Sequence, residues 1–382
     1  MTKIEGQSQE KKVKRSSGSA FKLTIVSLFI ALACIYYKFS AVTEVHDIKL
    51  GARNDQDSMA SQNRDYDQLK DNNDGINDDR IYRSILTHFI AGEQEEGVGA
   101  RVRRSVGTYQ MRRFTPFLML DDFTVAPPNG FPDHPHHGQE TITYVTDGMI
   151  AHEDITGSKG VLLKGDLQFM TAGKGIVHSE IPVTTKDGKP CRGLQLWVDL
   201  PSDMKNIDPR YRNLRGNETP VAYPNENLEV RVISGKSYGV ESLRDLAYTP
   251  VHLYHFLANK TGTEFVQDIP EDFNVFIYVM KGSIQVNDVE LTTFSSAFFD
   301  VDGNAIRGKA LSEDAQFAII AGRILDQEVI QHGPFVETNR EKLMEVFRNY
   351  QEEKNGFENA HSWRSSIHDG ISEEEALKLY RE

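Results

Sequence analysis

The chain has 382 residues, of which 39% are hydrophobic and 26% are charged, and its formal net charge is −13. This composition is that of a globular protein, and the length suffices for two or three domains. The acidic excess argues against a nucleic-acid-binding surface. The only two cysteines are Cys34 and Cys191, which excludes a zinc site built on thiolates. Because Cys34 lies in an apolar N-terminal run, we expect one free thiol and no internal disulfide in the folded part.

Residues 1–41 combine a basic leader with an apolar run, 23–37. Its 15 residues fall short of the roughly 20 that span a bilayer, but the flanking residues extend it. The following "YYKFSAV" is bulky and is a poor signal-peptidase site. We therefore predict an uncleaved signal anchor, with a cleaved signal peptide as the alternative. The remainder of the chain would be lumenal or extracellular, or cytoplasmic or nuclear if the segment does not insert.

Residues 42–80 form a polar segment rich in Asp and Asn, which predicts a disordered linker. Its string "DNNDGINDD" invites comparison with a calcium-binding loop. In an EF-hand loop, however, the residue five before the glycine and the residue six after it must both be acidic. Counted from Gly75, these positions hold Lys70 and Ile81. A solvated linker is the better interpretation.

Residues from about 82 to 325 contain short alternating runs, such as "ETITYV", "LEVRVIS", "NVFIYVMKGSIQV" and "AQFAIIAG". Gly, Asp, Asn and Pro separate these runs, a pattern that predicts an all-β sandwich or barrel. The pairs at 147–148 and 287–288 are typical of hairpin turns. Near the end the apolar period becomes helical, with Thr338 and Glu341 at the spacing of a capping box. Two glycosylation sequons begin at Asn217 and Asn259, and Pro220 makes the first a poor acceptor.

The stretch "FPDHPHHGQE", residues 131–140, places three histidines within four positions. In a strand, side chains at positions i and i+2 share a face. His134 and His136 therefore point the same way, whereas His137 points to the other face. A His-x-His pair of this kind can offer two imidazoles to one metal ion.

A second string, "GDLQFMTAGKGIVHSE", carries His178 and Glu180, again at i and i+2. If the two strands meet inside a barrel, they supply three imidazoles and one carboxylate. This set suits iron(II), with zinc, copper, manganese or nickel as alternatives, and leaves positions open for water, substrate or O2. Glu140 competes as the carboxylate ligand because it shares the face of His136. For His152 a solvated or core position is expected.

The region from about 225 to 325 offers no comparable ligand set. His252 and His255 are three positions apart and face opposite sides of a strand. A second barrel in this region is therefore expected to hold no metal. No P-loop, G-x-S-x-G or dinucleotide fingerprint occurs in the sequence.

Seven segments follow one another between residues 82 and 367: "EGVGARVRRSVG", "FTPFLMLDDF", "GFPDHPHHGQETITYV", "AHEDITG", "GDLQFMTAGKGIVHSE", "HGPFV" and "NGFENAHSWRSSI". In content and order they resemble the pirin family of the cupin superfamily. The resemblance implies two stacked jelly-roll barrels, over 81–215 and 216–335, followed by C-terminal helices over 336–382. It implies a single non-haem iron in the first barrel. The ligands it implies are His134, His136, His178 and Glu180.

The resemblance also implies two kinds of function. One is a quercetin 2,3-dioxygenase, whose partners are an aromatic small molecule and O2. For such a reaction we expect Glu180, once detached from the metal, to act as the base. The alternative is an iron-dependent binding or redox-sensing module that acts as a transcriptional co-regulator of a protein partner, without direct nucleic-acid contact.

The sequence departs from the family at three places. The usual "HPHRGFET" reads "HPHHGQET", so that His137 replaces Arg and Gln139 replaces Phe beside the expected metal. The N-terminal segment is the third departure, and its insertion into a membrane would argue against a soluble nuclear role.

Overall fold

The computed structural model describes residues 79–97 and 99–381. The predicted anchor, within 1–41, and nearly all of the predicted linker, 42–80, lie outside the described residues. Within the described ranges, no helix is long and apolar enough to cross a membrane.

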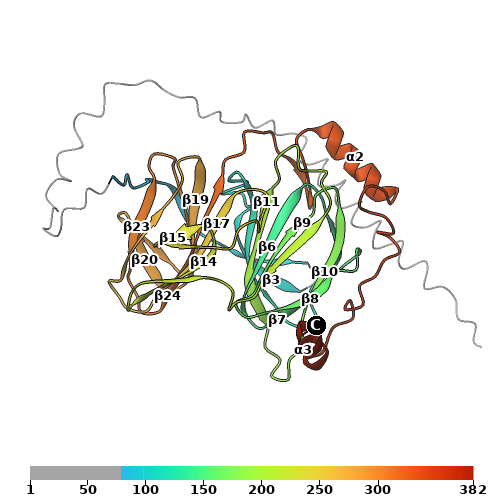
Figure 1. Ribbon diagram of the computed structural model, residues 1–382, viewed down its shortest axis with the longest axis horizontal. Coiled ribbons are helices and arrows are strands. Elements are labelled where there is room, and N and C mark those ends of the chain that lie inside the picture. The colour runs from blue at the N-terminus through green and yellow to red at the C-terminus, as the bar shows by residue number, and fades with distance from the viewer. Residues whose placement is uncertain (1–78, 98, 382) are drawn as a thin grey trace, which may run out of the picture. The chain divides into compact units, whose positions relative to one another are not determined.

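The described residues form two β-sandwiches with few helices, which confirms the predicted all-β fold (Figure 1). In the first sandwich, a seven-stranded sheet of order β12-β9-β6-β11-β4-β3-β2 faces a four-stranded sheet of order β5-β10-β7-β8. The strands are β2 (Glu93–Glu96), β3 (Ala100–Val106), β4 (Phe117–Val125), β5 (Phe131–His136), β6 (Gln139–Asp147), β7 (Met149–Asp154), β8 (Lys159–Leu163), β9 (Leu167–Thr171), β10 (Ile176–Pro182), β11 (Cys191–Asp199) and β12 (Arg210–Leu214).

The second sandwich repeats this arrangement, with a seven-stranded sheet of order β1-β22-β19-β24-β17-β14-β13 and a four-stranded sheet of order β18-β23-β20-β21. A small hairpin, β15 (Lys236–Ser237) and β16 (Val240–Glu241), lies beside it. The strands are β1 (Ile85–Ile90), β13 (Val221–Asn225), β14 (Leu228–Ser234), β17 (Val251–Ala258), β18 (Glu264–Asp268), β19 (Phe273–Lys281), β20 (Ser283–Val286), β21 (Val289–Thr292), β22 (Ser295–Phe299), β23 (Ala305–Ala310) and β24 (Ala315–Arg323).

Strand β1 belongs to the second sandwich, although it lies within the range 81–215 expected for the first. The two sandwiches correspond to the two predicted barrels and are called barrels from here on. It pairs antiparallel with β22 and forms an edge of the second seven-stranded sheet. Local pattern cannot reveal this exchange, because an edge strand of either barrel has the same alternation of apolar and polar residues.

The two predicted hairpin turns have different outcomes. The turn at 287–288 joins β20 to β21, whose end residues Val286 and Val289 pair directly. The turn at 147–148 is not a hairpin, because β6 and β7 belong to opposite sheets of the first barrel. Gly148 has a φ of 75°, so the chain makes the expected tight turn but leaves its sheet there.

The two barrels pack through their seven-stranded sheets. One apolar cluster joins Leu120 and Leu196 of the first barrel to Phe276 and Phe298 of the second. A cluster of buried apolar side chains fills the interior of the second barrel. The interior of the first barrel, in contrast, holds buried histidines and carboxylates.

The chain after the second barrel returns to the first. A hairpin of β25 (Ile330–His332) and β26 (Phe335–Glu337) is followed by α2 (Arg340–Gln351), and α3 (Glu373–Arg381) packs on β8 (Figure 1). The N-cap of α2 is Asn339, whose side chain accepts a hydrogen bond from the Lys342 backbone amide. The expected capping box that starts at Thr338 is therefore wrong by one residue. The apolar side of α2 covers Phe335 and Val177.

Candidate metal centre

Three histidines meet inside the first barrel. His134 and His136 lie on β5, and His178 lies opposite His134 on the neighbouring strand β10. The Nε2 atoms of His134 and His178 are 2.9 Å apart. The His136 ring lies 5.0 Å, centroid to centroid, from each of the other two rings. Of the described residues, only these three form a cluster of ligand atoms close enough to share one ion.

The chemistry of this cluster fits a metal ion. Burial lowers the pKa of all three imidazoles, so they are neutral and can donate a lone pair. His134 donates its Nδ1 hydrogen to the Pro132 carbonyl at 2.8 Å, so the Nε2 of the neutral ring carries no hydrogen and keeps its lone pair. The distance of 2.9 Å between the Nε2 atoms of His134 and His178 also suits a shared ion. Two nitrogens that each lie about 2.1 Å from a metal, in directions about 90° apart, are about 3 Å from each other. His136 Nε2 is buried without a protein partner.

Glu180 shares a strand face with His178, as the spacing predicts, but is not part of the three-histidine cluster. Its carboxylate accepts hydrogen bonds from the Thr143 hydroxyl at 3.2 Å and the Gln195 amide at 3.1 Å. Both donors come from the facing sheet. Burial raises the pKa of Glu180 to about 7, although these two hydrogen bonds oppose the shift. The carboxyl group therefore lies in the interior of the first barrel.

The competing carboxylate, Glu140, faces the second barrel. It accepts hydrogen bonds from the backbone amides of Tyr248 and Thr249 and from the Thr171 hydroxyl. These partners already occupy both of its oxygens. Glu140 is therefore a structural link between barrels, and the sequence alternative that makes it a metal ligand has no support in this geometry.

A row of five side chains on the facing sheet runs past the imidazoles. The residues are directly paired across β4, β11, β6, β9 and β12, so they share one face. In that order they are Met119, Trp197, Thr141, Met170 and Tyr211. The Trp197 ring meets His136 at 5.1 Å, and Tyr211 stacks on His152 at 5.7 Å. We call this set the aromatic row.

The aromatic row carries buried polar atoms that have no partner among the described residues. They include Trp197 Nε1, the Tyr211 hydroxyl and both ring nitrogens of the neighbouring His152. Burial lowers the pKa of His152 to about 4. Buried polar atoms usually find a hydrogen bond, so this side of the interior is suited to a ligand with several hydroxyl groups. Sequence reasoning missed Trp197 and Tyr211, because cross-strand register alone brings them to the histidines.

His137, the third histidine of the stretch, faces away from the cluster, as the alternation predicts. Its Nδ1 lies 2.9 Å from the Lys174 carbonyl, and its Nε2 lies 3.0 Å from the carboxylate of Glu337 on β26. Both His137 and Glu337 are buried. His137 thus attaches the C-terminal hairpin to the turn that follows β5, the strand of His134 and His136.

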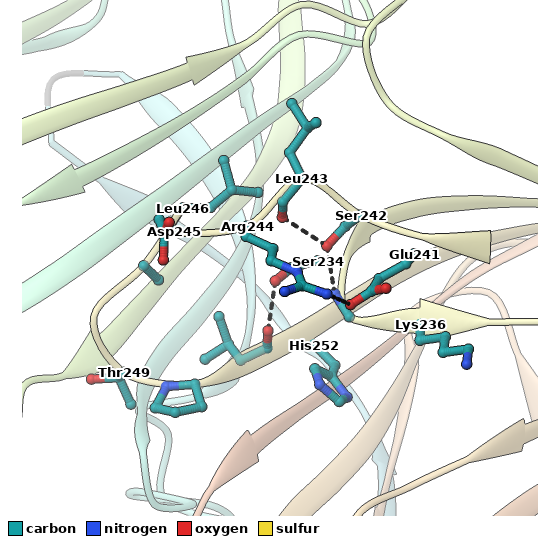
Figure 2. A pocket seen from close by; sticks show the side chains of 14 residues that line it. Ser234, Lys236, Glu241, Ser242, Leu243, Arg244, Asp245, Leu246, Thr249 and His252 are labelled. Atoms are coloured by element: carbon teal, nitrogen blue, oxygen red, sulfur yellow. Dashed lines mark hydrogen bonds and ion pairs between the residues drawn. The ribbon is translucent and has the colours of Figure 1, made fainter. Parts of the chain in front are cut away.

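A surface groove of about 420 Å³ in the second barrel is a rival site (Figure 2). It is lined by residues 234–236, 241–247 and 249–252, and it contains none of the predicted ligands. Its polar groups bond mainly to one another: Arg244 pairs with Glu241 at 3.1 Å, and the Ser234 hydroxyl donates to the Val251 carbonyl. Among the buried polar side-chain atoms of the groove, one nitrogen of His252 has no partner.

Comparisons with known proteins identify relatives that share this fold. The family model "Pirin" matches residues 99–198, and the model "Pirin C-terminal cupin domain" matches residues 254–356. The human protein Pirin is 38% identical over 291 residues, which cover 75% of this chain and 98% of that protein. Pirin-like protein 2 from Arabidopsis thaliana is 38% identical over 305 residues, 78% of this chain and 93% of that protein.

Among solved structures, a quercetin 2,3-dioxygenase from Acinetobacter baumannii superposes with a TM-score of 0.67 and 26% identity. The match covers 72% of this chain and 99% of that one. The protein GK1651 from Geobacillus kaustophilus superposes with a TM-score of 0.57 and 32% identity, over 65% of this chain and 99% of that chain.

Proposed function

This chain is a member of the pirin family, and on that premise we propose that it is a mononuclear non-haem iron protein that acts as a dioxygenase on a flavonol-like aromatic substrate. The observation that carries the proposal is the cluster of three neutral imidazoles, whose ligand atoms lie within 4.8 Å of one another. The buried carboxyl group of Glu180 follows two residues after His178 on the same strand face. The likeness to a structure described as a quercetin 2,3-dioxygenase supports the choice of reaction.

His134, His136 and His178 would hold the ion, and Glu180 is the fourth ligand implied by the family resemblance. When bound, iron(II) would act as a Lewis acid that lowers the pKa of a substrate hydroxyl and would supply the redox chemistry with O2. Glu180 is the carboxylate of the interior that can take the hydroxyl proton when it is not a ligand. Thr143 and Gln195 hold this carboxylate in place.

The aromatic row supports a planar substrate. Trp197 and Tyr211 offer ring faces on which an aromatic ligand can stack, and the two methionines adapt to its outline. The unpartnered Trp197 Nε1 and Tyr211 hydroxyl can hydrogen-bond to hydroxyl or carbonyl oxygens of a polyhydroxylated ring system. These groups also exclude bulk water from the reacting carbon.

The test is aerobic incubation of the iron-loaded chain with quercetin. We expect loss of the flavonol absorbance together with release of carbon monoxide. His178→Ala should lose both the iron and the activity, whereas His252→Ala, a matched change in the second barrel, should retain both. Iron-loaded wild-type protein that consumes no quercetin and releases no carbon monoxide would refute the dioxygenase reaction.

Glu180→Gln separates the role of this carboxyl group from that of the imidazoles. The amide keeps the size of the side chain but cannot take a proton. If Glu180 is the base, kcat should fall about 100-fold while the three imidazoles still bind iron. A variant with unchanged kcat would remove Glu180 from the reaction.

We also propose that segment 1–41 directs the chain to a membrane or to the secretory pathway. The sequon at Asn259 offers a reporter, because this residue is exposed in the loop between β17 and β18. A glycan on Asn259 and sedimentation of the chain with membranes are the expected results. An unglycosylated nuclear pool would instead favour the co-regulator alternative.

A further inference from the structure

Gln139, one of the chain's departures from the family pattern, lies directly against a metal-ligand imidazole. Its side chain is completely buried. Its Nε2 is 2.9 Å from His136 Nδ1 and 2.9 Å from the backbone carbonyl oxygen of Pro334. Its Oε1 is buried and has no partner among the described residues.

The Pro334 carbonyl determines which way the amide is turned. A carbonyl oxygen only accepts hydrogen bonds, so the group that faces it must be the NH2 and not the oxygen. The reverse orientation would place two oxygens 2.9 Å apart. The second hydrogen of the same NH2 is then directed at His136 Nδ1, which must act as the acceptor.

This contact determines the position of the proton on His136. A neutral imidazole carries one hydrogen, so a ring that accepts at Nδ1 is protonated at Nε2. His134 is the opposite case, because its Nδ1 donates its hydrogen to the Pro132 carbonyl and its Nε2 carries no hydrogen. Histidines that bind a metal usually donate the hydrogen of their far nitrogen to an acceptor. In this site His134 meets that condition. His136 faces a donor instead, and the Nδ1 of His178 has no partner among the described residues.

We propose that Gln139 is a positioning residue that holds His136, in the metal-free protein, in the tautomer protonated at Nε2 and thereby weakens metal binding. For His136 to become a ligand, the hydrogen must leave Nε2 and appear at Nδ1. Gln139 must then turn Oε1 toward the ring and give up its bond to Pro334. The inference rests on the metal site of the proposed function but not on the dioxygenase reaction.

The contact also couples the ion to a distant part of the chain. Pro334 lies between β25 and β26, in the hairpin that His137 binds through Glu337. Metal binding at His136 would therefore loosen one of the bonds between this hairpin and the first barrel. A member of the family with Phe at this position has no amide with which to make either contact.

The direct test is a long-range ¹H–¹⁵N spectrum of the metal-free chain with labelled histidines, assigned with a His136→Gln variant. We expect His136 to be protonated at Nε2 and His134 at Nδ1. A spectrum with His136 protonated at Nδ1 would overturn the inference. The spectrum decides the matter even if the protein has no activity toward quercetin.

A second measurement follows Co²⁺ binding by the wild-type chain and by Gln139→Glu, whose carboxylate can only accept from Nδ1. We expect Co²⁺ to bind the variant about ten- to hundredfold more tightly. Gln168→Glu is the matched control, because Gln168 is another buried glutamine of the same barrel and is bonded to Asn213 instead of a histidine. An equal gain in both variants would show that added charge alone is responsible and would count against the inference. A wild-type chain that binds no Co²⁺ would refute the metal site, while the histidine spectrum would still decide the tautomer.

Discussion

His137 is the histidine of the stretch 131–140 that faces away from the three-histidine cluster, as predicted. It stands next to His136, a predicted metal ligand, yet both of its ring nitrogens face acceptors, the Lys174 carbonyl and the Glu337 carboxylate. The ring thus links the Lys174 carbonyl to Glu337 of the C-terminal hairpin. Burial alone would raise the pKa of Glu337, but the hydrogen bond from His137 lowers it below its ordinary value.

We predict that His137→Phe lowers the free energy of unfolding by about 3 kcal/mol, because it leaves a buried carboxylate without its partner. Urea denaturation at pH 7 measures the loss. Adding Glu337→Leu to this variant should recover part of it, because the unpaired charge is then removed. Equal stability of His137→Phe and the wild type would show that Glu337 does not depend on this pair.

Gly138 lies at the contact between the turn and the C-terminal hairpin. Its φ of 71° is in the left-handed region. A Cβ atom at this position would meet the Val336 carbonyl oxygen at 2.0 Å. The hairpin can therefore approach the strand that carries His136 only if this residue has no side chain.

We predict that Gly138→Ala displaces the hairpin, destabilises the protein by at least 1 kcal/mol and reduces its metal content. Gly333→Ala is the control, because Gly333 also has a positive φ, 55°, but a Cβ there would meet no atom within 4 Å. Metal analysis and urea denaturation of both variants provide the comparison. Equal metal content and stability in the two variants would contradict the steric explanation.

At the scale of elements, α2 depends on its N-cap. Asn339 precedes the first helical residue, and its side chain accepts from the Lys342 backbone amide at 2.8 Å. The Thr338 hydroxyl contacts only the side-chain amine of Lys342, at 3.4 Å. The helix therefore begins one residue later than a capping box at Thr338 would have it.

We predict that Asn339→Ala costs about 1 kcal/mol of stability, whereas Thr338→Ala changes it by less than about 0.5 kcal/mol. Thermal and urea unfolding of the two variants distinguish the caps. A larger loss for Thr338→Ala would show that Thr338 caps the helix in solution.

At the scale of the whole molecule, the joint between the barrels contains an ionisable pair. The Tyr278 hydroxyl of the second barrel donates to Asp122 of the first at 2.8 Å. Burial raises the pKa of Asp122 to about 6, above its ordinary value of 3.8, although this hydrogen bond opposes the rise. The folded state therefore favours the protonated carboxyl group. Its contribution to stability is full below about pH 4 and is lost as the pH rises through about 6.

We predict that Asp122→Asn stabilises the protein relative to the wild type at pH 7.5 more than at pH 4.5. The amide keeps an acceptor for Tyr278 but does not ionise. Urea denaturation of both proteins at the two pH values gives the comparison. A stability difference that is the same at both values would show that Asp122 ionises as freely in the folded protein as in the unfolded chain.

The sequence by itself determined the features that depend on local order. Alternating runs predicted the all-β fold, and the i, i+2 spacing placed His134 with His136 and His178 with Glu180 because side chains in a strand alternate between faces. It also placed His137 on the other face and predicted that Cys191 is a free thiol; the structure adds that this thiol is buried.

Only the tertiary structure decided the features that depend on which strands are neighbours. The pairing of β10 with β5 brought His178 to His134, and the register of the facing sheet brought Trp197 to His136. The same applies to Glu337 and Pro334, which reach the turn at 137–139 from about 200 residues away. No periodicity along the chain encodes these contacts, because sheet order and register arise from the packing of both barrels together.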